Sequence, residues 1–228
     1  MRYKIKYSSI TPNIPKELIY NENCYVGISI NNDFFWGKHT DIFFEWIEKR
    51  FNHCKIVIGD YIHRHNEIIF NDSDYDEAVR RSLYFGKQIK ELLSKIEILQ
   101  SPKFKILHWN EIYKKNEMIQ FTNKINNAYL NSSDFKYLVD SSAKEFISRQ
   151  VKANRLPLTS YDDCVQHSVN YIKEELSVFC YLIKNDFKVQ VYPGSQLPIL
   201  KHFASNKVDL ELELKDGIYI DLKTVKIK

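Results

Sequence analysis

The stretch from 24 to 32, with the sequence CYVGISINN, restricts the possible folds of this chain more than any other segment. Its first part is short, apolar and β-branched, and polar turn residues bound it, which is typical of a buried strand. A helix is expected over about 40–51, where apolar residues recur at spacings of three and four. A strand that feeds a helix is the first half of a βαβ unit, and open α/β sheets bind ligands beyond the carboxyl ends of such strands. We therefore predict a functional site where this strand ends.

Ser29 stands at that end, so its hydroxyl can reach a substrate, and Gly27 on the same face leaves space beside it. The alternative is that Ser29 is a turn or capping residue, as most serines at strand ends are. The segment is not the G-x-S-x-G elbow of esterases, because position 31 is asparagine and no glycine-rich oxyanion loop is present. Ser29 is thus a candidate nucleophile that needs support from elsewhere in the chain.

Strands and helices are predicted to alternate along the chain. Apolar runs predict strands at 24–30, 54–59, 103–107 and 187–192, and helical spacing predicts helices at 40–51, 74–97, 109–129, 133–151 and 160–184. This alternation predicts an α/β fold, a Rossmann-like parallel sheet flanked by helices. A chain of 228 residues suits one domain over 1–228. Within it we expect a lead-in segment at 1–23 and a C-terminal hairpin at 207–223, around an Asp-Gly turn.

Composition excludes several classes of protein. Hydrophobic residues make up 44% of the chain, which suffices for a sizeable core. The four cysteines form no C-x-x-C pair and have no metal-like spacing with the histidines, so we expect reduced core residues, no metal and no cofactor. No apolar run approaches membrane-spanning length, and the N-terminus lacks the apolar region of a signal peptide. These features predict a cytoplasmic protein without a membrane partner.

Two groups of side chains allow more than one interpretation. The helix over 74–97 carries Arg80, Arg81, Lys87 and Lys90, which form either an ordinary solvated face or a surface that neutralises nucleic-acid phosphates. His63 and His65 follow the second strand; no third ligand is near, so loop histidines at the sheet edge are expected in preference to a metal site.

The helix over 160–184 supplies two candidate residues. Tyr171 and Glu175 are four residues apart, so a phenol and a carboxylate lie one above the other beside an apolar stripe. Such a carboxylate is usually at the surface. At the mouth of a pocket it would hold an amine.

Four short motifs occur in one order in this chain. They are Gly27-Ile28-Ser29-x-x-Asn32, Asn154-Arg155, Asn170-Tyr171-x-x-x-Glu175 and Val191-Tyr192-Pro193-Gly194-x-x-x-Pro198. In order and spacing they resemble the cyclodipeptide synthases, over roughly residues 24–198. Members of that family build a cyclic dipeptide from two aminoacyl-tRNAs, and their fold is similar to the catalytic domain of class I aminoacyl-tRNA synthetases.

The resemblance implies a role for each catalytic candidate. Ser29 would be the nucleophile that takes the first aminoacyl group from its tRNA. Tyr171 and Glu175 would anchor the aminoacyl ammonium, and Tyr192 would take part in a later proton transfer. Tyr192-Pro193 places the chain in the Tyr-Pro branch of the family, whereas Asn32 is typical of the other branch, so the role of Asn32 stays open.

The resemblance also implies binding residues. Asn154 and Arg155 match residues near the second substrate. The pocket for the first amino acid would be lined at the positions of Tyr25, Trp109, Val178 and Gln190. Because two bulky rings shrink a pocket, a small first residue such as glycine or alanine is expected.

The chemistry implied by the family suits the residue types present. An aminoacyl ester is already activated, so no ATP site is needed, and the reaction needs a hydroxyl nucleophile, a clamp for an amine and a route for protons. The basic helix would then neutralise acceptor-stem phosphates of the two tRNA substrates. We expect a monomer. Two other functions stay open: an α/β serine hydrolase, in which His63 or His65 and an acid converge on Ser29, and a non-catalytic tRNA- or nucleotide-binding module.

Overall fold

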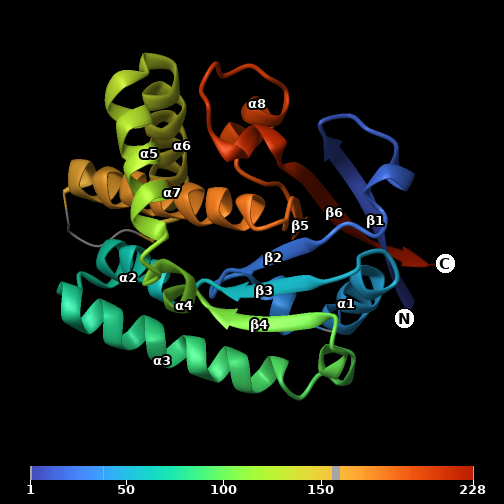
Figure 1. Ribbon diagram of the computed structural model, residues 1–228. Helices are drawn as coiled ribbons and strands as arrows, with labels where there is room; N and C mark the ends of the chain where they lie inside the picture. The colour runs from blue at the N-terminus through green and yellow to red at the C-terminus, as the bar shows by residue number, and fades with distance from the viewer. Residues whose placement is uncertain (1, 38, 156–159, 228) are drawn as a thin grey trace.

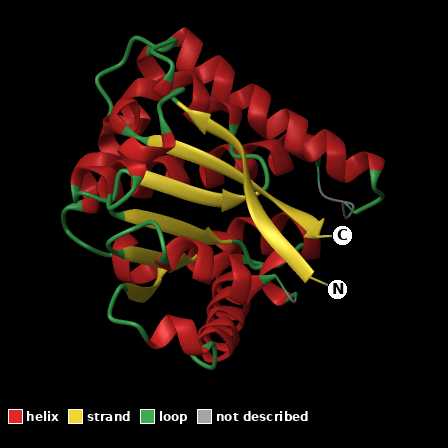
Figure 2. Cartoon of the chain, turned by 90° about the vertical axis from the view of Figure 1, so that its right-hand side faces the viewer, coloured by secondary structure: helices red, strands yellow, loops and turns green. Residues whose placement is uncertain are grey.

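A six-stranded sheet with helices on both faces forms the core of the protein (Figures 1 and 2). The structure is a computed structural model that describes residues 2–37, 39–155 and 160–227. The strand order is β1-β6-β5-β2-β3-β4. Four strands form the parallel centre: β2 (Cys24–Ile28), β3 (Cys54–Ile58), β4 (Phe104–His108) and β5 (Val189–Pro193). The predicted α/β fold, a parallel sheet flanked by helices, is confirmed.

The two ends of the chain pair with each other; the first strand was not predicted, and the last one extends the second strand of the expected hairpin. β1 (Arg2–Thr11) lies at the edge of the sheet and pairs antiparallel with β6 (Ile218–Ile227), which in turn pairs parallel with β5. The expected lead-in segment at 1–23 is therefore wrong, since its first half is a strand that buries Ile5.

The expected hairpin at 207–223 is also wrong. Its predicted first strand does not form. Val208, Leu212 and Leu214 pack into the apolar cluster of the helices instead. Leu214 lies in the 3-10 helix η5 (Glu213–Asp216). The residues after Gly217 pair with β5 and β1 instead of folding back on their own neighbours.

The helices divide into two layers. One face of the sheet is covered by α1 (Thr40–Glu48) and the C-terminal half of α3 (Tyr75–Leu93), which share a core cluster with the even-numbered residues of β2. The other face is covered mainly by α5 (Met118–Asn131), α6 (Ser133–Lys152), α7 (Tyr161–Lys184) and α8 (Pro198–Ala204). Side chains alternate along a strand, so Tyr25 and Gly27 face the α7 layer.

Two local predictions need correction. The segment 109–129 is not one helix but two, α4 (Trp109–Tyr113) and α5, separated by a turn at 114–117. His63 and His65 are not loop residues. They lie in the 3-10 helix η3 (Tyr61–His63) and in α2 (Arg64–Asn71), and both are buried, with the carboxylates of Glu67 and Glu174 beside them.

All four cysteines are free and buried, as expected for core residues. Within the described ranges, no helix combines the length and the apolar character that a membrane crossing requires.

Candidate active site

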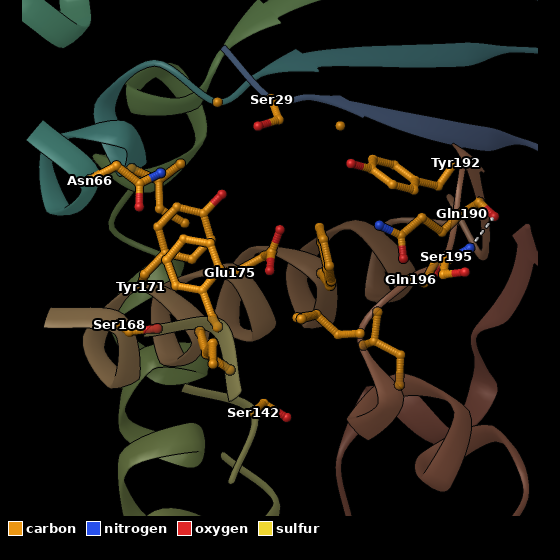
Figure 3. A pocket seen from close by; sticks show the side chains of 18 of the residues that line it. Ser29, Asn66, Ser142, Ser168, Tyr171, Glu175, Gln190, Tyr192, Ser195 and Gln196 are labelled. Carbon is orange, nitrogen blue, oxygen red and sulfur yellow. Dashed lines mark hydrogen bonds between the residues drawn. The ribbon is translucent and has the colours of Figure 1, made fainter. Parts of the chain in front are cut away.

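A cavity of about 430 Å³ opens beyond the carboxyl ends of β2 and β5, between the sheet and α7. Ser29, Tyr171, Glu175 and Tyr192 all line it. Figure 3 shows their hydroxyl and carboxylate groups pointing into one common space. Three separate segments thus bring together four side chains that are up to 163 positions apart in the sequence.

Ser29 follows the last residue of β2 and is only partly covered. Its main-chain oxygen accepts a hydrogen bond from the Asn32 N–H at 3.1 Å, which starts the turn after the strand. Its hydroxyl has no hydrogen-bond partner among the residues that the structure describes. A Cβ added at Gly27 would meet no atom within 4 Å, so this side of the strand borders open space next to Ser29.

Glu175 is a carboxylate without a counter-ion in the described part of the chain. Burial raises the pKa of Glu175 to about 8. Burial, together with the negative charge of Glu175, raises the pKa of the neighbouring Tyr171 phenol well above its ordinary value. A desolvated carboxylate that no protein cation neutralises favours a positively charged ligand. The pair can therefore accommodate a cationic group in the cavity that Ser29 also lines.

Asn32 connects the turn after β2 with Tyr192 on β5. Its Nδ2 donates a hydrogen bond to the Tyr192 hydroxyl at 3.1 Å, while its Oδ1 accepts one from the Phe34 N–H at 3.1 Å. Burial raises the pKa of Tyr192, and the bond from Asn32 partly offsets that increase. Because Asn32 donates to the phenol oxygen, the phenol proton of Tyr192 stays free for another acceptor.

Glu174, which the sequence analysis did not single out, fixes the position of α7. It accepts two hydrogen bonds from Arg64, at 3.1 and 2.5 Å, and one from the Trp109 indole N–H at 2.9 Å. His65 Nε2 lies 3.5 Å from the same carboxylate. Burial opposes ionisation, but the nearby His65 and the bonds from Arg64 prevail and lower the pKa of Glu174. These contacts connect α7 with α2 and α4 at the position next to Glu175.

A second, more open hollow of about 1120 Å³ adjoins the cavity. Ser29, Asn66, Phe146 and Tyr192 line both. The hollow is also lined by Asn32, Arg81 and Arg155. Ser29 therefore borders two adjoining compartments, of which the second is the more open.

The predicted binding residues are placed in different ways. Trp109 and Gln190 line the cavity. Tyr25 and Val178 do not; both are 0% exposed within the core, where the Tyr25 ring packs on Phe179 at a centroid distance of 5.3 Å. The expectation of a small first residue required both rings at the cavity, so it loses its basis.

Arg155 borders the open hollow, whereas Asn154 is not among its lining residues. Asn154 is exposed at the end of α6, where it adopts a left-handed backbone conformation with a φ of 51°. Asparagine tolerates that conformation well, which is a structural reason for its presence there.

The four basic residues of α3 do not act as one group. Arg81 Nε lies 2.8 Å from the buried carboxylate of Glu67, at the wall of the open hollow. Arg80 is exposed and bonded to Glu77, Lys87 is exposed, and Lys90 lies 3.7 Å from Glu111.

The histidines near Ser29 do not form a hydrolase triad. His63 Nε2 lies 3.4 Å from Glu67 and its Nδ1 is 3.3 Å from the Asn66 amide, so both ring nitrogens face groups other than Ser29. The residues described contain no cluster of three or more His, Cys, Asp or Glu side chains that could hold a metal ion.

Solved structures share this architecture. The chain is similar to a CDPS (cyclodipeptide synthase) from Fluoribacter dumoffii, with 18% identity over 100% of both chains and a TM-score of 0.84. It is also similar to a cyclodipeptide synthase from Candidatus Glomeribacter gigasporarum bound to Phe-tRNAPhe, with 16% identity over 92% of this chain and 91% of the other and a TM-score of 0.65. A Mycobacterium tuberculosis protein, whose structure relates cyclodipeptide synthetases to type I tRNA synthetases, has 11% identity over 96% and 93% and a TM-score of 0.68. No protein-family model matches the sequence, and no curated protein does either.

Proposed function

From the fold that this chain shares with the cyclodipeptide synthases, we propose that it makes a cyclic dipeptide from two aminoacyl-tRNAs, through an aminoacyl ester on Ser29. One observation carries the proposal: a serine hydroxyl without a partner and a carboxylate without a counter-ion, among the described residues, line the same cavity. An aminoacyl ester needs both, a nucleophile for its carbonyl and an anion for its ammonium.

The first step is a transfer between two esters. Ser29 Oγ attacks the carbonyl carbon of the first aminoacyl-tRNA, the bond from that carbon to the ribose oxygen breaks, and the ribose oxygen takes up a proton. The Ser29 proton passes to the leaving ribose oxygen by way of the substrate's neighbouring ribose hydroxyl, because His63, which borders the open hollow with Ser29, lies against Glu67 and Asn66 instead. Glu175 and Tyr171 hold the ammonium during this step.

The second step uses the open hollow. A second aminoacyl-tRNA enters along Arg155 and Arg81, and its amine attacks the ester on Ser29, which forms the peptide bond and frees the serine. The amine of the first residue then attacks the remaining ester, closes the ring and releases the second tRNA. Tyr192 lines both compartments, so it can move protons in these later steps. We propose that the protein acts as a monomer in the cytoplasm and belongs to the Tyr-Pro branch.

A direct assay tests the proposal. The purified protein is incubated with charged tRNAs, and cyclic dipeptides are measured by mass spectrometry. Product formation without ATP is expected, since the aminoacyl ester is already activated. If the protein instead hydrolyses simple activated esters and forms no dipeptide, the serine hydrolase is the correct alternative. If it binds tRNA but forms neither product, the non-catalytic binding module is.

The hydrogen bond from Asn32 to Tyr192 gives a prediction about the late steps. Asn32→Asp keeps an oxygen that can accept from the Phe34 N–H but removes the donor to Tyr192. We expect dipeptide formation to slow about five- to tenfold, the value of one hydrogen bond of about 1 kcal/mol. The aminoacyl ester on Ser29 should accumulate, which intact-protein mass spectrometry would detect. An equal slowing of ester formation would contradict a role confined to the late steps.

The exposed basic side chains of α3 give a prediction about tRNA binding. Arg80→Glu combined with Lys87→Glu should weaken tRNA binding and reduce the salt dependence of the binding constant, by about one unit of slope for each phosphate that is no longer neutralised. Lys184→Glu combined with Lys188→Glu, two exposed lysines at and just after the C-terminal end of α7, is the matched control and should leave binding unchanged. Equal effects of both changes would mean that net charge, and not this face of α3, attracts the tRNA.

A further inference from the structure

Two glutamines in the wall of the cavity each have an amide oxygen without a hydrogen-bond partner in the described structure. Gln190 on β5 is 4% exposed, and Gln196 in the turn before α8 is 7% exposed. Figure 3 shows both on the side of the cavity near Tyr192. A buried amide oxygen that accepts no hydrogen bond is costly, so most such groups in folded proteins have a partner. A ligand that donates to these oxygens would remove the cost.

Gln196 is held in place by its surroundings. Its Nε2 donates to the main-chain oxygen of Ile220 at 3.0 Å, and its main-chain N–H donates to Asp221 Oδ1 at 3.1 Å. Asp221 is buried and accepts from Ser9 at 2.7 Å and from Lys201 at 2.5 Å. Because the amide nitrogen of Gln196 is already used, its oxygen is left as the group that can only accept.

Gln190 faces the same layer of helices. It pairs in register with Tyr25 on β2 and with Tyr219 on β6, and both of these rings are buried in the α7-side core. Apolar side chains make up much of the remaining cavity wall, among them Ile172, Phe179 and Leu200. A cavity that received an aliphatic side chain would be better served by apolar residues at positions 190 and 196. The two amides therefore point to a polar ligand group.

We propose that the first aminoacyl group carries a side chain ending in an uncharged N–H or O–H donor, which Gln196 and Gln190 receive. This inference rests on the proposed function and concerns the substrate of the same site. A cationic side chain would need a counter-ion beside the two amides, and the Glu175 carboxylate is taken by the substrate's ammonium. The pocket thus selects by a hydrogen bond and not by small size.

The test measures only the first step, the transfer to Ser29. All twenty aminoacyl-tRNAs are supplied singly, and the mass added to the protein is read by intact-protein mass spectrometry. Side chains of similar shape are compared, tyrosine with phenylalanine, threonine with valine, and asparagine with leucine. The preferred substrate is expected to carry an uncharged donor and to exceed its apolar counterpart at least about tenfold, because a site built to hydrogen-bond rejects the analogue that lacks the group.

Gln196→Met and Gln190→Met remove the acceptors with little change of volume. Each should reduce the preference for the donor-bearing side chain over its apolar counterpart about tenfold or more. Gln166→Met, on the exposed face of α7, is the matched control and should leave the preference unchanged. A wild-type protein that takes an apolar side chain best would overturn the inference while the proposed function stands. A donor preference that both variants retain would overturn the role of the two glutamines. Failure to form any ester on Ser29 would instead refute the proposed function.

Discussion

Replacing Ser29 by alanine is expected to abolish cyclic dipeptide formation, with a loss of about 10⁴-fold or more, as for other enzymes that lose a covalent nucleophile. The mass of the aminoacyl ester should disappear from the protein at the same time. Binding of tRNA should persist, because the exposed basic side chains of α3 lie on another element. Mass spectrometry of the product and of the intact protein measures both effects.

The matched control is Ser142→Ala. Ser142 lines the same cavity, but its hydroxyl donates to the main-chain oxygen of Leu138 at 2.8 Å and is not free to react. This variant should keep product formation within a few-fold of the wild type. If Ser29→Ala retained activity comparable to that of Ser142→Ala, the covalent mechanism would be wrong.

Replacing Glu175 by glutamine should have two opposite effects. Product formation should fall by about 100-fold or more, because a neutral amide cannot hold the substrate's ammonium as a carboxylate does. The folded state should become more stable than the wild type at alkaline pH, since the desolvated carboxylate is removed. Glu145→Gln, which removes an exposed glutamate at the same cavity, should show neither effect.

The pH range of the stability effect follows from the pKa of Glu175. The folded-state pKa of about 8 lies above the usual value of 4.5, so between these values the unfolded chain is ionised while the folded protein holds the proton. Stability is then fully present below pH 4.5 and is lost as the pH rises to about 8. Each unit of pKa difference corresponds to about 1.4 kcal/mol, and screening in the partly open cavity reduces the total to about 2–3 kcal/mol. Urea unfolding of both proteins at about pH 5 and pH 9 measures it; equal differences at the two pH values would contradict a desolvated Glu175.

The parts of the fold that could be predicted from the sequence are those with a strong local period. Central strands such as β2 and β3 are short apolar runs, and α7 is a long apolar stripe that begins at the Ser160 cap, so their positions follow from local pattern alone. β1 was missed although its residues alternate with period two, because Pro12 and Pro15 after it suggested an irregular segment. The alternation at 208–214 predicted a strand that does not form, since its apolar residues are buried against the helices and are not paired in the sheet.

The candidate site could be predicted only in part. The positions of Ser29 and Glu175 follow from where a strand ends and how a helix spaces its residues. Partners that are distant in sequence have no local signal, and Glu174 with Arg64 is such a pair, 110 residues apart. The wrong placement of Tyr25 has a related cause, because period two fixes which face a strand residue takes but not how far along that face the cavity extends.

The position of β6 between β1 and β5 has a consequence for how the chain is assembled during translation. β1 leaves the ribosome before every other strand of the sheet, whereas the strand it pairs with, Ile218–Ile227, emerges after all of them. β2, which Ser29 follows, and β5, which carries Tyr192, both emerge before β6 and can already pair with each other. At that stage β2 and β5 are available to each other, whereas Arg2–Thr11 has no partner in the sheet.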